Sequence, residues 1–144
     1  MEIKFYDKID DNLLKFAVII ADFNGKFVFC KHKERNTYEI PGGHRENNET
    51  IEETANRELY EETGATDFIL KPVCVYSVTG KNRVNKTGDE TFGMLFYAEI
   101  RTFEHKLHSE IERIDFFDKM PENLTYPDIP PILIKEFSRR KNGI

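Results

Sequence analysis

One helical segment, Thr50 to Glu62, constrains the fold most, because both of its ends and its buried face can be assigned from the sequence. Thr50 is placed to cap the amino end, and Glu53 three residues later completes a capping box. Gly64 stands where a left-handed residue ends a helix. The apolar residues repeat every four positions and form one narrow stripe: Ile51, Ala55 and Leu59. The sequence therefore predicts a helix with one buried face.

The same helix carries three glutamates close to its apolar stripe. Counting about 100° per residue, Glu58 and Glu62 project within about 20° of Ile51, and Glu61 projects within about 80°. Removing water from carboxylates this close together costs roughly several kcal/mol of free energy unless they are protonated or neutralised by a cation. Mg²⁺ prefers oxygen ligands and completes its shell with water and phosphate oxygens. The pattern predicts a Mg²⁺ site; a solvated charged helix is the alternative for an isolated pattern of this kind.

The remainder of the chain reads mainly as strands, with one further helix. Asn24-Gly25 favours a tight hairpin that pairs Leu13–Ala21 with Lys26–Cys30. Residues 130–141 predict a final helix, and residues 79–90 predict a long loop. The later predicted strands are Ile69–Ser77, Thr91–Ile100 and Ile114–Phe117.

Length and charge narrow the classes of function. A chain of 144 residues predicts one domain, 1–144. The net charge of -5 argues against binding to a nucleic-acid polymer, which depends on clustered Lys and Arg. Cys30 and Cys74 lie in apolar runs and are expected to be buried, reduced thiols. Neither a signal peptide nor a membrane-spanning run is recognisable, so we expect a cytoplasmic protein with no membrane partner.

The acidic helix is part of a longer motif. Gly43, five residues, Glu49, seven residues, then Arg57-Glu58-Leu59-x-Glu61-Glu62-x-Gly64-Ala65 resembles the Nudix box. Ala65 is a small residue for the last, apolar position. The resemblance implies an α/β/α sandwich with a mixed β-sheet, in which the box forms a catalytic loop-helix-loop.

The resemblance also implies which residues form the catalytic centre. Glu58, Glu61 and Glu62 match metal-binding and catalytic positions, with Glu58 the best candidate in the box to accept a proton from water. The Gly42 carbonyl would bind metal, and Arg57 would orient a neighbouring glutamate. The implied cofactor is Mg²⁺, with Mn²⁺ as an alternative.

Further site residues lie outside the box. The family's downstream acidic ligand is assigned to Glu110 first and Glu112 second. The candidates for substrate binding are Lys31, Arg35, Tyr38 and Arg83. Each can instead be an ordinary surface or core residue.

The implied activity is hydrolysis of a nucleoside diphosphate linked to another group, by attack of water on phosphorus. We expect a nucleoside triphosphate, including oxidised forms such as 8-oxo-dGTP, to yield monophosphate and pyrophosphate. The alternative substrates are ADP-ribose, a nucleotide sugar or a dinucleoside polyphosphate. A non-catalytic sensing or protein-binding domain is a further alternative, as is an isomerase that uses a cysteine. The sequence also leaves open whether the protein forms a homodimer.

Overall fold

The structure is a computed structural model that describes residues 1–81, 86–104 and 110–142. Eight strands of the described residues form one mixed sheet, ordered β1-β6-β7-β2-β3-β4, with β5 paired to β2 and β8 paired to β3. The strands are β1 (Glu2–Tyr6), β2 (Leu14–Phe23), β3 (Lys26–His32), β4 (Tyr38–Glu39), β5 (Gly42–His44), β6 (Ala65–Thr79), β7 (Thr91–Phe103) and β8 (Ile111–Phe117). A short 3₁₀ helix, η1 (Asp11–Leu13), precedes β2.

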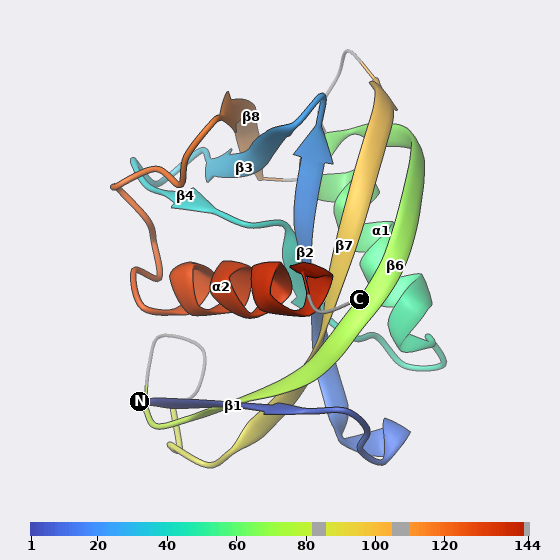
Figure 1. Cartoon of the computed structure of the whole chain (residues 1–144), viewed down its shortest axis with the longest axis vertical. Coiled ribbons are helices and arrows are strands. Elements are labelled where there is room, and N and C mark those ends of the chain that lie inside the picture. Colours follow the sequence, from blue (N-terminus) through green and yellow to red (C-terminus); the bar gives the residue numbers. More distant parts are fainter. Residues whose placement is uncertain (82–85, 105–109, 143–144) are drawn as a thin grey trace.

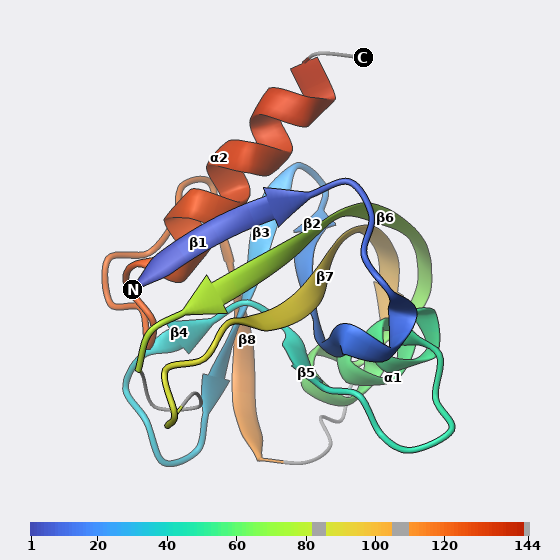
Figure 2. The ribbon, with the colours of Figure 1, turned by 90° about the horizontal axis from the view of Figure 1, so that it is seen from below.

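Two helices cover the sheet. Figures 1 and 2 show α1 (Ile51–Thr63) and α2 (Ile129–Asn142) on opposite faces, which gives the expected α/β/α sandwich. The capping box of Thr50 and Glu53 is present, and Gly64 ends α1 in the left-handed region at φ 78°. None of the helices in the described ranges has the length and apolar character needed to cross a lipid bilayer.

The predicted hairpin forms, but its two strands soon part. Asn24 and Gly25 both have positive φ, 53° and 82°, as a type I′ turn requires. Pairing between β2 and β3 is limited to Asp22 with Phe27 and Phe23 with Lys26. Beyond that point β2 pairs parallel with β7 and antiparallel with β5, while β3 turns to β4 and β8. A continuous apolar strand such as β2 suits this central, doubly covered position.

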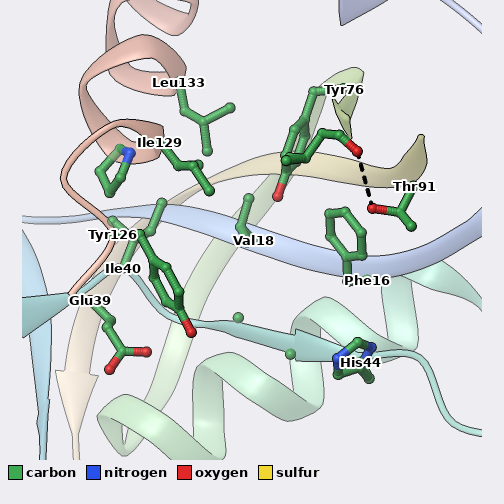
Figure 3. Close-up of a pocket in the computed structure, with 14 residues that line it drawn as sticks. Phe16, Val18, Glu39, Ile40, His44, Tyr76, Thr91, Tyr126, Ile129 and Leu133 are labelled. Atoms are coloured by element: carbon green, nitrogen blue, oxygen red, sulfur yellow. Dashed lines mark hydrogen bonds between the residues drawn. The ribbon is translucent and has the colours of Figure 1, made fainter. Parts of the chain in front are cut away.

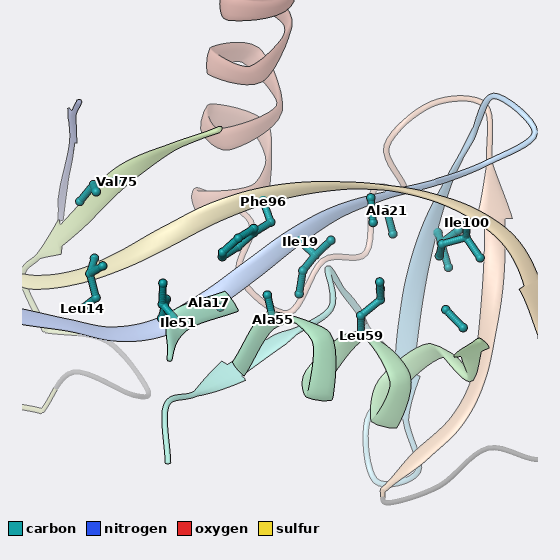
Figure 4. Packing of buried hydrophobic residues seen from close by; sticks show 13 residues of the cluster. Leu14, Ala17, Ile19, Ala21, Ile51, Ala55, Leu59, Val75, Phe96 and Ile100 are labelled. Carbon is teal, nitrogen blue, oxygen red and sulfur yellow. The ribbon is translucent and has the colours of Figure 1, made fainter. Parts of the chain in front are cut away.

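Each face of the sheet has its own core. The stripe of α1 packs on one face, where Ile51 is 3% exposed and Ala55 and Leu59 are 0% exposed (Figure 4). Leu133 of α2 is fully buried on the other face, against Ile20 and Leu95. The carboxylates of α1 are therefore held at the border between a packed core and solvent. Cys30 and Cys74 are buried and unpaired, as expected.

Candidate active site

Two glycines bring strand β5 against the carboxylates of α1. The Gly42 amide donates a hydrogen bond to Oε1 of Glu62 at 2.8 Å. At Gly43 an added Cβ would lie only 2.5 Å from Oε1 of Glu58. Any larger residue at position 43 would therefore occupy the space that the Glu58 carboxylate now fills.

Arg57 joins the box loop to the helix. Its Nε and Nη2 donate to the two carboxylate oxygens of Glu49, at 2.6 and 3.0 Å. Its Nη1 donates to Glu58 at 2.6 Å and to Glu61 at 3.3 Å. Nη2 also donates to the carbonyl oxygen of His44 in β5, at 3.0 Å. One planar guanidinium thus fixes the loop, the strand and the carboxylates relative to one another.

Glu49 holds the Arg57 guanidinium in place. Its carboxylate also accepts hydrogen bonds from the Glu46 amide at 3.0 Å and from the Thr54 hydroxyl at 2.7 Å. Hydrogen bonds from Arg57, followed by the Glu46 amide, lower the pKa of Glu49 to about 2. Glu49 is therefore a stable anion that holds the loop on α1.

The pKa values of Glu58 and Glu62 are shifted in the opposite direction, upward. Burial raises the pKa of Glu62 to about 8 against the lowering effect of the Gly42 amide, and the negative charges of Glu58 and Glu39 add to the rise. Burial also raises the pKa of Glu58, although Arg57 opposes it. Burial thus disfavours the charged form of both groups, and an additional cation would offset this penalty.

The donor set fits a hard divalent cation, but it is not preformed. Glu58, Glu61 and Glu62 offer only oxygen atoms, the ligands that Mg²⁺ prefers. Across the ranges that the structure describes, no three acidic, histidine or cysteine side chains converge on one point. Glu58 and Glu61 are turned toward Arg57, while Glu62 is held by the Gly42 amide. Binding a cation between them requires Glu58 and Glu61 to turn away from the arginine.

The two downstream carboxylates differ in their surroundings. The backbone carbonyl of the exposed Glu110 accepts a hydrogen bond from the Lys33 amide at 2.9 Å, and together with His32 and Arg35 this residue lines a small polar hollow. Glu112 instead accepts a hydrogen bond from Nζ of Lys31 at 2.9 Å, which lowers its pKa. Glu110 therefore has the freer side-chain position of the two.

The predicted substrate-binding residues are spread over separate contacts. Lys31 is buried and paired with Glu112, so its charge is already compensated. Arg35 donates to Glu39 at 2.7 Å, and the hydroxyl of Tyr38 donates to Asp115. Arg83 lies outside the described residues.

His32, which no sequence motif selects, lies beside the carboxylates. Its Nε2 is 3.8 Å from Glu62 and 3.6 Å from Glu39. A single histidine at the end of a strand carries no signal of function, so only the pairing of β3 with β4 reveals this neighbourhood.

A cavity of about 220 Å³ lies on the α2 side of the sheet, next to the box loop. Figure 3 shows its wall of apolar and aromatic side chains between the sheet and α2. We call it the α2 pocket; it is lined by Phe16, Val18, Glu39, Ile40, Gly42, Gly43, His44, Tyr76, Val78, Thr91, Tyr126, Ile129, Pro130 and Leu133. Because Gly42 and Gly43 belong both to this lining and to the carboxylate site, the two features share β5.

The fold is a mixed sheet between two helices. Its site is a group of glutamates, held by an arginine, on a glycine-containing loop and a helix. Together the fold and the site define a hydrolase of phosphoric anhydride bonds. The chain matches the family model described as NUDIX domain over residues 12–131, and it belongs to that family. The predicted family, fold and enzyme class are thereby confirmed.

Known relatives agree with this class. The chain is 33% identical to "Putative 8-oxo-dGTP diphosphatase YtkD" of Bacillus subtilis (strain 168), over 87% of this chain and 75% of the relative. It is 27% identical to "ADP-ribose pyrophosphatase" of Methanocaldococcus jannaschii, over 86% and 72%. The solved structure of a mutant of the Bacillus subtilis pyrophosphohydrolase BsRppH has a TM-score of 0.74 and 28% identity, over 95% of this chain and 90% of that one.

Proposed function

We propose that the protein is a Mg²⁺-dependent hydrolase that converts a nucleoside triphosphate, including oxidised forms such as 8-oxo-dGTP, to monophosphate and pyrophosphate. The observation that carries this proposal is the group of glutamates on α1. Glu58 and Glu62 are buried enough to have raised pKa values, yet they lie beside Glu61 on an exposed edge. A divalent cation neutralises such a group and can at the same time bind the phosphate oxygens of an anionic substrate. The choice of triphosphate rests on the relative named as an 8-oxo-dGTP diphosphatase.

In the proposed reaction, the oxygen of a water molecule bonds to one of the two phosphorus atoms beside a bridging oxygen. The bond from that phosphorus to the bridging oxygen breaks, and its electron pair leaves with the departing phosphate group. Bound to the glutamates, Mg²⁺ would supply neutralisation of the phosphate charge and a lower pKa for water.

The protein's own groups have distinct roles in this proposal. Glu58 accepts the proton of the attacking water, since burial raises its pKa toward the range in which a carboxylate is an effective base. Glu61, Glu62 and the Gly42 carbonyl supply oxygen ligands, with Glu110 as the downstream ligand. Arg57, anchored by Glu49, orients Glu58 rather than the substrate.

Product analysis tests the proposal. The protein is incubated with 8-oxo-dGTP, dGTP, ADP-ribose, a nucleotide sugar and a dinucleoside polyphosphate, each with Mg²⁺, with Mn²⁺ and with EDTA. Selective formation of monophosphate and pyrophosphate from triphosphates, abolished by EDTA, supports the proposal. Turnover that persists in EDTA contradicts the metal assignment.

A second candidate substrate is ADP-ribose, because the Methanocaldococcus jannaschii relative is named as an ADP-ribose pyrophosphatase. The same panel separates the two candidates. Preferential formation of AMP and ribose 5-phosphate would move the assignment to ADP-ribose without changing the roles of the glutamates.

A further inference from the structure

A second arginine, Arg45, holds the loop that leads from β5 to α1. Its Nε donates a hydrogen bond to the backbone carbonyl of Glu49 at 2.7 Å. Its Nη1 donates to the carbonyls of Asp11 and Leu14, at 2.8 and 3.3 Å, and its Nη2 donates to the Asp11 carboxylate at 2.8 Å. Figure 2 shows this loop next to η1, which contains Asp11. With its side chain 19% exposed, Arg45 is a partly buried cross-link between the loop and the start of β2.

The loop, residues 45–49, needs this cross-link because neither neighbouring element fixes it. The pairing of β5 with β2 ends at His44, and α1 starts only after the loop. Within the loop, the amide of Glu49 donates to the carbonyl of Glu46 at 3.2 Å, which is long for a backbone hydrogen bond. The position of Glu49 relative to β2 therefore depends on the side chain of Arg45.

Glu49 connects this cross-link to the carboxylates of α1. Its backbone carbonyl accepts a hydrogen bond from Arg45, while its carboxylate accepts two from Arg57 at 2.6 and 3.0 Å. Arg57 in turn donates to Glu58 at 2.6 Å. Each guanidinium fixes direction as well as distance, because its donors form a rigid, planar fork. A shift of the Glu49 backbone is therefore passed on to the Glu58 carboxylate.

The contacts of Arg45 also separate it from the reacting groups. In the part of the chain that the structure describes, none of its hydrogen bonds goes to the glutamates of α1. Its contacts use four of the roughly five N–H groups of a guanidinium, which leaves little capacity for a substrate phosphate. An effect of Arg45 on the reaction must therefore pass through Glu49.

We propose that Arg45 is a positioning residue for the reaction: by holding Glu49 it sets the orientation of Arg57 and hence of the Glu58 carboxylate. This inference rests on the proposed function, in which Glu58 accepts the proton of water. It adds a residue that the motif does not specify, because Arg45 is one of the five unspecified positions between Gly43 and Glu49.

The kinetic test compares Arg45→Lys with a matched control, Arg140→Lys. Arg140 is 26% exposed and likewise joins distant segments, since it donates to Glu136 at 2.7 Å and to Asp7 at 3.4 Å. Lysine keeps the charge but lacks the fork of donors. Arg45→Lys should lower kcat about tenfold and keep KM within about twofold, because the base is misplaced while the substrate contacts remain. Arg140→Lys should leave kcat and KM unchanged, although both variants should melt below the wild type.

Nuclear magnetic resonance separates this proposal from the proposed activity, because it needs no substrate. The Nε–H group of Arg57, which donates to Glu49, is identified by the loss of its signal in Arg57→Lys. In the metal-free wild type this hydrogen should exchange slowly with water, since its carboxylate partner is only 13% exposed. Exchange should be about tenfold faster in Arg45→Lys and unchanged in Arg140→Lys, even if none of the tested nucleotides is hydrolysed.

The outcomes that overturn the proposal are distinct. Unchanged exchange at Arg57 in Arg45→Lys overturns it, whether or not kcat falls. A raised KM with normal kcat also overturns it, because Arg45 would then contact the substrate. If circular dichroism shows that Arg45→Lys does not fold, Asp11→Ala takes its place, since it removes only one of the four contacts. The same directions are then expected in kcat and in exchange, each by about twofold.

Discussion

Replacing Gly43 by alanine tests whether the position of the Glu58 carboxylate controls turnover. The new methyl group would lie 2.5 Å from Oε1 of Glu58, whereas ordinary contact begins at 3.4 Å. The carboxylate must therefore withdraw by about 1 Å, and a misplacement of that size costs roughly 100-fold in rate. Since the carboxylate is at the end of a flexible side chain, we expect the free energy of unfolding to change by less than about 1 kcal/mol.

The matched control is Gly42→Ala in the same strand. There the methyl group would meet the carbonyl oxygen of Ala17 at 2.5 Å and a methyl group of Val18 at 2.8 Å. Strand backbone cannot yield as a side chain does, so this variant should lose about 1–3 kcal/mol of stability. The assay is kcat at saturating Mg²⁺ together with the melting temperature in EDTA. A Gly43→Ala protein with kcat within about threefold of wild type would refute the role of Glu58.

Three further predictions concern charge and cysteine chemistry. Because the pKa of Glu62 is raised from 4.5 to about 8 in the folded protein, the metal-free protein should lose stability as pH rises through this interval. Glu62→Gln should then have a higher melting temperature than the wild type at about pH 9, with no gain at about pH 4. With Mg²⁺ its turnover should be orders of magnitude slower. Equal turnover would contradict the metal assignment. The lowered pKa of Glu49, from 4.5 to about 2, contributes stability that is lost as pH falls through this interval. Arg57→Lys loses the paired contact to Glu49, so its stability, measured by circular dichroism, should fall less than that of the wild type as pH drops through this interval. At about pH 7 the variant should have a lower melting temperature than the wild type, and its kcat should be about tenfold lower. An unchanged melting temperature would contradict the anchoring role. Cys74→Ala should keep kcat within about twofold, and a large loss would instead favour a cysteine nucleophile.

The parts of the site that depend on local spacing could be predicted from the sequence. Thr50, Glu53 and Gly64 interact with neighbours three or four residues away, so the bounds of α1 are predictable to within one residue. The helical period likewise places Glu58 and Glu62 beside the apolar stripe. Short-range geometry of this kind is contained in the order of the residues.

The parts that depend on distant pairing could not be predicted. The turn at Asn24-Gly25 forms as expected, but the sequence does not tell that β2 leaves β3 after two residue pairs. The pairing of Lys31 with Glu112 could not be predicted either, because the position of Glu112 depends on a register shift between β3 and β8. The α2 pocket draws its wall from segments as distant as Phe16 and Leu133, so no spacing along the chain predicts it.

The parallel pairing of β2 with β7 also determines when a catalytic centre can exist during folding. Leu14 pairs with Phe92 and Phe23 with Ile100, so each pair closes a loop of roughly 78 residues. The whole of α1 lies inside that loop, and it can form its hydrogen bonds long before β7 is in place. Contacts of such long range make folding slow. In refolding experiments, helical signal should therefore return early, while hydrolysis returns only with the late closure of the sheet.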